Sequence, residues 1–449
     1  MKVLLVSANT LTQPYPVYPL GLDYVAGAIA DRHAVWLLDL NAAADENALA
    51  AAIDDFAPDV VGISLRNIDT TDASNPKGFF AGYRKLAADI HARSGAAIVL
   101  GGSGFTIFPS EMMHALGADY GIVGEGERLA LLLEALENRA DAASIPGVVT
   151  RHGPVTFPQP WEEGIVRQFD SNRPHLAYYL ANGGMLNLQT KRGCRFNCIY
   201  CTYPNIEGRA MRLFDPREVA GTARRLQEAG ARYFFVTDSA FNADADHSLA
   251  VARAFRKAGV SIPWGAFFAP VRVVGDYYRQ LADAGLSHAE FGTESLCDAV
   301  LKAYRKPFQA EDVFTAHAAA VAAGLHVAHY ILLGGPGETP ATMAHTLDRL
   351  EGLDKCALFF FCGMRIYPRT GLYAVACREG QAGAAGDLLE PLFYRSPTID
   401  GRAIMAAVRE HAAGRLNWIV GDGGAQTAGV ISRMHARGHV GPLWEHRIR

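Results

Sequence analysis

Three cysteines in one short run, Cys194, Cys198 and Cys201, constrain this chain more than any other feature of its sequence. Three residues and then two residues separate them, so the run supplies three thiolates and no fourth. A cubane 4Fe–4S cluster bound by three cysteines keeps one iron open to a ligand from outside the chain. The residues between the cysteines are largely polar or aromatic, which indicates a loop rather than a stripe of buried thiols. The run therefore predicts an iron–sulfur site.

The bulk composition describes an ordinary globular protein. The chain has 449 residues, enough for about two or three domains. Half of its residues are apolar and a fifth are charged. The formal net charge of −4 gives no electrostatic reason to expect a nucleic acid or an anionic membrane as partner. No apolar run approaches the ~20 residues of a membrane-spanning helix, and Met1–Ser7 does not resemble a signal peptide.

The seven cysteines do not form a disulfide framework, because their number is odd and four of them are scattered. We expect these four, Cys297, Cys356, Cys362 and Cys377, to be inert core or surface thiols. Cys362 is the best exception, because it ends a predicted strand. Free thiols and a cluster both favour a reducing compartment, and so a cytoplasmic location.

Residues 1–137 alternate short apolar runs with helical patterns, which predicts a parallel sheet wrapped by helices. The pattern indicates a five-stranded, doubly wound α/β domain. The expected strands are Val3–Ser7, Ala34–Leu38, Val60–Ser64, Ala97–Leu100 and Tyr120–Val123. The expected helices are Leu20–Asp31, Glu46–Phe56, Phe79–Ala92, Pro109–Leu116 and Arg128–Glu137.

Ligands of such sheets bind outside the carboxyl ends of the strands. Small residues recur at these ends, which suggests that something large and flat approaches the backbone closely. The residues at the ends are Ser7, Asn9, Ser64, Arg66, Asn67, Gly101, Gly102, Gly104, Gly124 and Glu125.

Residues 138–184 read as a linker with a small β element near Gly147–Phe157. From Met185 the alternation resumes, and six strand–helix units over 185–379 predict an incomplete barrel. The expected strands are Met185–Thr190, Tyr233–Thr237, Pro263–Phe268, His288–Gly292, Ala328–Leu333 and Leu358–Ile366. Residues 380–449 form a C-terminal segment with a helix near Ala403–Leu416, and Tyr394–Pro397 and Trp418 are expected to shape a pocket.

Polar groups recur at the strand ends of this second domain. A zwitterionic ligand that carries a ribose needs carboxylates, a guanidinium and bare glycine backbone around it. Each segment also has a plainer interpretation, since Thr339 and Pro340 can simply open a helix and Asp238 can cap a turn. Their recurrence in one barrel favours a shared ligand site. The candidates are Asp238, Ser239, Glu294, Gly337, Glu338 and Arg365.

Taken together, these residues make the chain resemble the cobalamin-binding radical S-adenosylmethionine (SAM) proteins, and among them the class B methyltransferases. The resemblance covers most of the chain and implies a Rossmann-like cobalamin-binding domain, a partial (β/α)6 radical SAM barrel and a short α-rich C-terminal segment. The matching segments are Pro19–Leu22, Ser64–Asp69, Gly101–Gly102, Gly124–Glu127, the three cysteines, Asp238–Asn242, Gly292–Ser295, Gly337–Thr339 and Arg365–Pro368.

The resemblance implies three cofactors. The three cysteines would bind a 4Fe–4S cluster, the barrel candidates would contact SAM, and the N-terminal strand ends would contact cobalamin. It also implies methyl transfer from SAM through cobalt to an unactivated carbon of a small molecule. An external electron donor such as flavodoxin or ferredoxin would serve the cluster. The sequence does not identify a catalytic residue.

Two departures from the family pattern matter. Many cobalamin proteins place a His beneath cobalt after the first strand, where this chain has Ser7–Thr12 and no His. His33 is expected to be a surface turn residue, so the resemblance implies base-off cobalamin, with Arg66 a candidate to lie under the corrin. The second barrel strand ends in Thr237–Ser239 instead of Gly-Gly-Glu-Pro, which makes Asp238 or Ser239 a substitute by position only.

Other functions remain open at this stage. The enzyme could use cobalamin and SAM without methylating, in a rearrangement, an oxidation or transfer of the aminocarboxypropyl group. It could be a non-catalytic cobalamin or redox sensor, although an open iron argues against a purely structural cluster. It could also be a radical SAM enzyme whose N-terminal domain has lost its corrin. No motif names a substrate.

Overall fold

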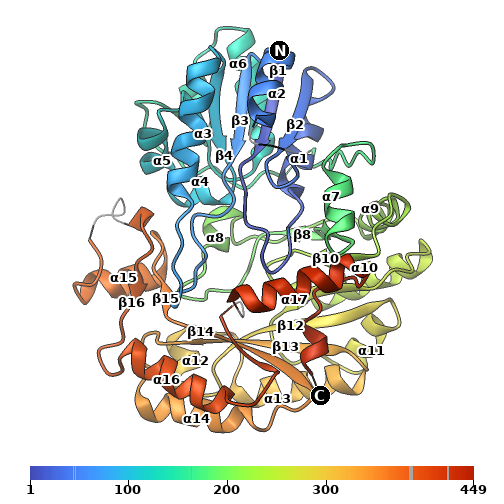
Figure 1. Ribbon diagram of the computed structural model, residues 1–449, viewed down its shortest axis with the longest axis vertical. Coiled ribbons are helices and arrows are strands. Elements are labelled where there is room, and N and C mark those ends of the chain that lie inside the picture. Colours follow the sequence, from blue (N-terminus) through green and yellow to red (C-terminus); the bar gives the residue numbers. More distant parts are fainter. Residues whose placement is uncertain (44, 46, 163, 384–387, 422–423, 449) are drawn as a thin grey trace.

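The computed structural model describes residues 1–43, 45, 47–162, 164–383, 388–421 and 424–448. Two α/β layers lie one above the other in Figure 1, the blue N-terminal layer at the top and the yellow and orange barrel at the bottom. Each layer is built on its own sheet. The α/β fold class predicted from the sequence is confirmed.

The first sheet has six strands in the order β2-β1-β3-β4-β5-β6. The first five in sequence are parallel, as expected from the alternation of strands and helices. The sixth pairs antiparallel with β5, so the prediction of five strands was wrong by this one strand, which comes from the expected linker. The strands are β1 (Lys2–Ser7), β2 (Ala34–Asp39), β3 (Val60–Ser64), β4 (Ala97–Gly101), β5 (Tyr120–Ile122) and β6 (Val148–Thr150).

Side chains alternate across this sheet and bury both of its faces. Val3 and Leu5 of β1 belong to one apolar core, and Leu4 and Val6 belong to another. Strands buried on both faces read as continuous apolar runs, which explains why β1 could be recognised from sequence. Helices α1 (Leu20–Ile29) and α6 (Leu129–Glu137) cover the first face, while α2 (Ala48–Phe56), α3 (Phe80–Arg93) and α5 (Pro109–Leu116) cover the second.

The second sheet is parallel throughout, in the order β17-β14-β13-β12-β11-β10-β7. Six of its strands are those predicted for the partial barrel, and a seventh, β17, comes from the C-terminal segment and extends the sheet beside β14. The strands are β7 (Met185–Leu188), β10 (Tyr233–Val236), β11 (Trp264–Phe268), β12 (Leu286–Glu294), β13 (His326–Leu333), β14 (Cys356–Cys362) and β17 (Trp418–Val420).

Helices cover the outer face of this sheet. Aromatic side chains such as Phe234 and Trp264 fill the core between the sheet and these helices. The long helices are α9 (Pro216–Glu228), α10 (Ala245–Lys257), α13 (Ala310–Ala322), α14 (Pro340–Leu350) and α16 (Gly401–Ala412). Shorter ones are α11 (Tyr277–Ala282), α12 (Asp298–Ala303) and α15 (Gly371–Arg378). On the inner face, Trp444 of the 3-10 turn η5 (Trp444–Arg447) donates a hydrogen bond to Glu290 at 2.9 Å.

Several boundaries differ from expectation for identifiable reasons. The last predicted barrel strand ends before Gly363, whose φ of 125° is a conformation that glycine adopts readily. The chain continues as β15 (Met364–Arg365), which pairs with β16 (Phe393–Tyr394). The expected start of the second helix at residue 46 lies outside the described residues. His33 is buried rather than a surface residue, because its Nδ1 lies 3.3 Å from the amino group of Met1.

Loops from the first layer reach down to the barrel, as the blue segments of Figure 1 show. Tyr15, in the loop after β1, packs against Met185, Tyr233 and Phe235 of the barrel. In the part of the chain that the structure describes, no helix is both long and apolar enough to cross a membrane. The domain boundaries predicted at residues 137, 184 and 379 stay predictions.

Candidate functional site

The three predicted cluster cysteines lie on a loop closed by a short hairpin. Strand β8 (Lys191–Arg192) pairs antiparallel with β9 (Arg212–Leu213), and the loop runs between them. Gly193 opens the loop with a φ of 85°, and a Cβ there would lie 2.1 Å from the oxygen of Ala210. The backbone can therefore approach this closely only at glycine.

All three thiols face one cavity of about 320 Å³, referred to below as the cluster cavity. Burial raises the pKa of Cys201 to about 12 and raises that of Cys198 as well. Thiolates crowded in an apolar cavity need compensating positive charge, which iron supplies. The three cysteine thiols supply three of the four protein ligands that a cubane cluster can take, which fits a cluster with one open iron.

A charged group borders the thiols. Glu294, predicted from the fourth barrel strand, accepts hydrogen bonds from Tyr200 Oη at 2.6 Å and from Lys306 Nζ at 2.9 Å. All three residues line the cluster cavity. Burial alone would lower the pKa of Lys306, but Glu294 and Cys198 outweigh it and raise the pKa. The cavity thus presents a carboxylate, a phenol and an ammonium group beside the cysteines.

The remaining predicted SAM contacts are placed differently from one another. Ser239 lines the cluster cavity. Asp238 is buried and lies outside the cavity lining, where it accepts hydrogen bonds from the nitrogen of Thr190 at 2.9 Å and from its Oγ1 at 2.6 Å. Asp238 therefore fixes the end of β7, and Ser239 is the member of this pair that can reach a ligand.

Gly337 and Glu338 also lie outside the lining of the cluster cavity. Glu338 is fully buried and accepts hydrogen bonds from the nitrogen of Gly334 and from Tyr304 Oη. Burial raises the pKa of Glu338 to about 7, although these hydrogen bonds oppose the rise. Its position indicates a structural role at the turn after β13.

Arg365 does not face the cluster cavity. Its guanidinium is buried and pairs with Asp69 Oδ2 at 2.7 Å, and it also donates to the main-chain oxygens of Ile366 and Leu388 at 2.6 Å. These contacts do not support the prediction that Arg365 binds the SAM carboxylate, because the guanidinium is already engaged by a carboxylate of the first layer.

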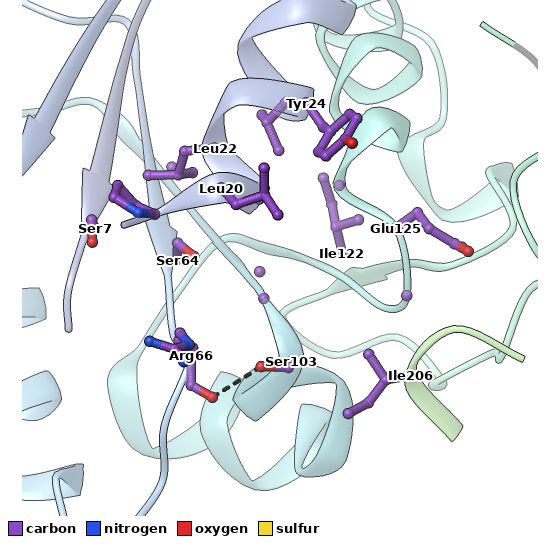
Figure 2. Close-up of a pocket in the computed structure, with 18 of the residues that line it drawn as sticks. Ser7, Leu20, Leu22, Tyr24, Ser64, Arg66, Ser103, Ile122, Glu125 and Ile206 are labelled. Atoms are coloured by element: carbon purple, nitrogen blue, oxygen red, sulfur yellow. Dashed lines mark hydrogen bonds between the residues drawn. The ribbon is translucent and has the colours of Figure 1, made fainter. Parts of the chain in front are cut away.

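A second, larger cavity of about 470 Å³ lies between the first sheet and the cluster hairpin. Figure 2 shows Ser7, Ser64 and Arg66 on one side of this space and Leu20 and Tyr24 of α1 on the other. Eight of the ten predicted cobalamin contacts line it. They are Ser7, Asn9, Ser64, Arg66, Gly101, Gly102, Gly124 and Glu125.

Glycines shape this second cavity in two ways. A Cβ at Gly101 or at Gly21 would meet no atom within 4 Å, so these residues leave open volume. At Gly102, with a φ of 94°, a Cβ would lie 2.8 Å from the oxygen of Leu65, so the backbone is held close. The small residues at the strand ends thus make room for a broad ligand, as the sequence suggested, and the cavity fits cobalamin in this respect.

The other two predicted cobalamin contacts, Asn67 and Gly104, do not line this cavity but contact residues at its edge. Asn67 Nδ2 donates to Asn9 Oδ1 at 3.3 Å, and Gly104 lies against the main-chain oxygen of Leu65. Arg66 is exposed to the cavity, and Ser103 Oγ donates to its main-chain oxygen at 3.0 Å (Figure 2). Among the described residues, no acid forms an ion pair with Arg66, so its cation is available to a ligand.

Glu125 also anchors the barrel hairpin to the first layer. Its carboxylate pairs with Arg128 at 3.2 Å and with Arg212 of β9. Nearby, Arg192 of β8 pairs with Glu127 at 2.8 Å. These buried pairs fix the cluster hairpin against the carboxyl edge of the first sheet.

Tyr203 belongs to the linings of both cavities, and no other described residue does. It begins the short helix α8 (Tyr203–Ile206), two residues after Cys201, and its hydroxyl lies 3.4 Å from the oxygen of Thr237. The two predicted cofactor sites are therefore neighbours that share one aromatic wall.

Comparison with known protein families matches both layers. The model of the radical SAM superfamily matches residues 188–350, and that of the B12 binding domain matches residues 6–133. These ranges contain the cluster loop and the sheet edge that borders the second cavity.

The chain is a cobalamin-binding radical SAM protein. It is similar to named methyltransferases. The tryptophan 2-C-methyltransferase of Streptomyces laurentii is 25% identical over 82% of this chain and 73% of the relative. The cytidylyl-2-hydroxyethylphosphonate methyltransferase of Streptomyces wedmorensis is 26% identical over 86% of both chains. The chain is thus a radical SAM enzyme of the methyltransferase type.

Solved structures share its fold. The radical SAM methyltransferase TsrM from Kitasatospora setae, with tryptophan and a SAM analogue bound, superposes with a TM-score of 0.88. The two chains are 23% identical, and the match covers 99% of this chain and 97% of TsrM. The cobalamin-dependent SAM radical enzyme OxsB has a TM-score of 0.74 at 16% identity, over 92% of this chain and 67% of OxsB. The predicted two-layer architecture is therefore confirmed for this cobalamin-binding radical SAM protein.

Three residues of the cluster cavity were missed by sequence reasoning. Lys306, Tyr200 and Tyr203 were not singled out as site residues, although Tyr200 lies between two cluster cysteines and Tyr203 follows the third. Their closeness to the motif was a usable signal. Lys306 had no such signal, because it lies beyond α12, 12 residues from Glu294 in sequence, and only the fold of this segment brings the two side chains together.

Proposed function

We propose that this enzyme transfers a methyl group from SAM to a carbon atom of a small molecule. When bound, the cluster and SAM supply a radical or an electron, and cobalamin carries the methyl group. The observation that supports this reaction most directly is the contact of the two cavities at Tyr203. A group held in the larger cavity then has to pass only one side chain to reach a substrate in the cluster cavity.

The residues of the chain hold and orient the reactants. Cys194, Cys198 and Cys201 would bind the cluster, while Ser239 and the pair of Glu294 and Lys306 would orient SAM beside the open iron. A carboxylate can accept from an amino group, and an ammonium group can donate to a carboxylate. Both ends of the amino-acid part of SAM thus find partners in one cavity.

On the cobalamin side, the eight lining residues at the strand ends would hold the corrin and its side chains. Asn67 and Gly104 would support them from behind through Asn9 and Leu65. Arg66 would face the corrin, because it lines the cavity and no histidine is among the described lining residues. A cation there is a poor ligand for cobalt, because a guanidinium has no lone pair to donate.

The lining of the cluster cavity favours a flat substrate with a large apolar surface. Phe267, Phe268 and Tyr330 line it, and Tyr330 Oη donates to the buried Glu290 at 2.7 Å. The phenol oxygen of Tyr330 is then left to accept a hydrogen bond from an N–H group of a substrate. Tryptophan, which is named for the Streptomyces laurentii enzyme and for TsrM, is the first candidate to test.

The reaction also needs electrons from outside the chain. We propose a flavodoxin or a ferredoxin as donor, and a reducing cytoplasmic setting, because a low-potential cluster bound by three thiolates has to be kept reduced.

The deciding experiment uses the full chain reconstituted with iron, sulfide and hydroxocobalamin. The enzyme is incubated with a reductant, candidate substrates and SAM labelled with CD3, and the products are analysed by mass spectrometry. Methyl transfer gives a labelled substrate and S-adenosylhomocysteine. Release of methylthioadenosine would instead support aminocarboxypropyl transfer, and absence of any SAM-derived product would support a sensor.

A matched pair of variants controls this experiment. Cys198→Ala removes a predicted cluster ligand, and we expect loss of cluster absorbance and of product. Cys377→Ala removes an exposed thiol outside both cavities and should keep both. Equal activity of the two variants would contradict the cluster assignment.

A further inference from the structure

Three potential metal ligands meet in the apolar layer between the barrel sheet and its helices. His317 lies on α13, His329 on β13 and Cys356 at the start of β14, and all three are buried. None of them lines the cluster cavity or the cobalamin cavity. Val327 and Ile331, which precede and follow His329 on the same face of β13, belong to the apolar core. Two imidazoles are unusual in such a layer.

The donor atoms are close enough to share one ion. His317 Nδ1 lies 3.0 Å from His329 Nε2, and one ligand atom from each of the three residues lies within 4.8 Å of the others. Zinc is bound at about 2.0–2.1 Å by histidine nitrogen and about 2.3 Å by cysteine sulfur, so its ligand atoms are roughly 3–4 Å apart. A small closure of the thiol toward the two rings completes such an arrangement.

The far side of each imidazole faces an oxygen. Thr293 Oγ1 lies 2.8 Å from His329 Nδ1, and Asp354 Oδ1 lies 3.7 Å from His317 Nε2. Histidines that bind metals commonly direct their second nitrogen to such an oxygen, which fixes the orientation of the ring. The same arrangement leaves His317 Nδ1 and His329 Nε2 directed at each other and at the ion position.

We propose that His317, His329 and Cys356 bind one zinc ion, separate from the iron–sulfur cluster. Two nitrogens and one thiolate are a donor set that suits zinc. Binding releases the proton of the Cys356 thiol, while the proton between the two rings moves to the outer nitrogen of its own imidazole, so that both rings stay neutral. The fourth position is open to water or to the oxygen of Leu353, which lies 3.4 Å from Cys356 Sγ. The ion would tie α13 to β13 and β14, and this proposal does not depend on the reaction proposed above.

Metal analysis of the full chain with its cluster in place tests the site. The protein is incubated with excess zinc, separated from free metal and analysed for zinc and iron. We expect about one zinc per chain in addition to the cluster iron. Cys356→Ala should lose the zinc and keep the iron, whereas Cys198→Ala should lose the iron and keep the zinc. Cys362→Ala, a second buried thiol on β14, should keep both.

X-ray absorption at the zinc edge of the unchanged protein gives an independent answer that requires no variant to fold. The expected spectrum has one sulfur neighbour and two imidazole nitrogens. Three sulfur neighbours would mean that zinc had entered the cluster site, and only oxygen or nitrogen neighbours would mean surface binding. Either spectrum, or less than about a tenth of an equivalent of bound zinc, would overturn the proposal and leave a hydrogen-bonded histidine pair.

Discussion

Arg365 Nε donates to Asp69 Oδ2 at 2.7 Å, and this pair joins the barrel to the first layer. Both side chains are buried. Asp69 also accepts from the nitrogen of Thr71 at 2.8 Å, so its carboxylate is fixed from both layers. The pair lies outside both cavities. We interpret it as an interaction that fixes the barrel against the first layer and so keeps the two cavities adjacent.

Removing Asp69 should therefore destabilise the protein strongly. Asp69→Ala leaves the guanidinium of Arg365 buried without its partner, and breaking a buried pair in this way costs about 3–5 kcal/mol. Chemical denaturation should show this loss in the free energy of unfolding. Glu228→Ala, which breaks the exposed pair with Arg224, is the control and should cost less than about 1 kcal/mol. Equal effects of the two substitutions would contradict this role of the pair.

The raised pKa of Glu338 leads to a prediction of how the stability of the protein depends on pH. Burial raises its pKa from 4.5 to about 7 in the folded state, so folding favours the protonated carboxyl. Its contribution to stability is fully present below pH 4.5 and is lost as the pH rises to about 7. One pKa unit corresponds to about 1.4 kcal/mol, so the loss amounts to about 3 kcal/mol.

Glu338→Gln removes this titration. The free energy of unfolding of the variant, measured relative to the unchanged protein, should increase between pH 5 and pH 8. Glu351→Gln, at a half-exposed glutamate, should show no such trend. If the variant and the unchanged protein differed by the same amount at both pH values, Glu338 would not carry a raised pKa.

Sequence reasoning succeeded where the chemistry lies in one contiguous run or at the end of an apolar strand. The cluster cysteines and the glycines at the end of β4 and after β5 are of this kind, and Glu294 was singled out because it follows an apolar strand. The pairing of Arg365 could not be predicted, because its partner, Asp69, lies 296 residues away in sequence. Nothing local to an arginine reveals whether a distant carboxylate already engages it.

For the fold as well, elements with a pattern in their own sequence were predicted, and elements that depend on a distant partner were not. Apart from β17, the parallel strands of both sheets have strong apolar patterns and were predicted close to their observed bounds. β6 and β17 are each three residues long, and pairing with a neighbouring strand defines them. Short strands that depend on a partner carry little periodicity of their own.

Gly101 offers a direct test of the cobalamin cavity. A Cβ at this position meets no atom within 4 Å, so Gly101→Leu should fold but fill part of the cavity. We expect the variant to retain much less cobalamin after gel filtration, measured by absorbance, with the cluster unaffected. Gly82→Leu is the control, because Gly82 also faces open space but lies on the exposed side of α3. Full retention by Gly101→Leu would contradict the assignment of the cavity.

The position of Tyr203 between the two cavities leads us to expect that it couples SAM consumption to methylation. Its ring is the wall shared by the two cavities, so Tyr203→Ala would merge them and admit water to the reacting groups. Misplacement of reactants by about 1 Å can cost roughly 100-fold in rate. We expect the ratio of methylated product to SAM consumed to fall by roughly 10-fold or more.

The aromatic ring, rather than the hydroxyl, should carry this effect. The hydroxyl makes one long contact, 3.4 Å to the oxygen of Thr237, so Tyr203→Phe should restore most of the ratio. Absorbance of the cluster and of cobalamin in both variants shows whether the cofactors are still bound. A normal ratio in Tyr203→Ala, or an equal loss in Tyr203→Phe, would show that the ring does not separate the two reactions. The ring then would not be the barrier that keeps methyl transfer coupled to SAM consumption.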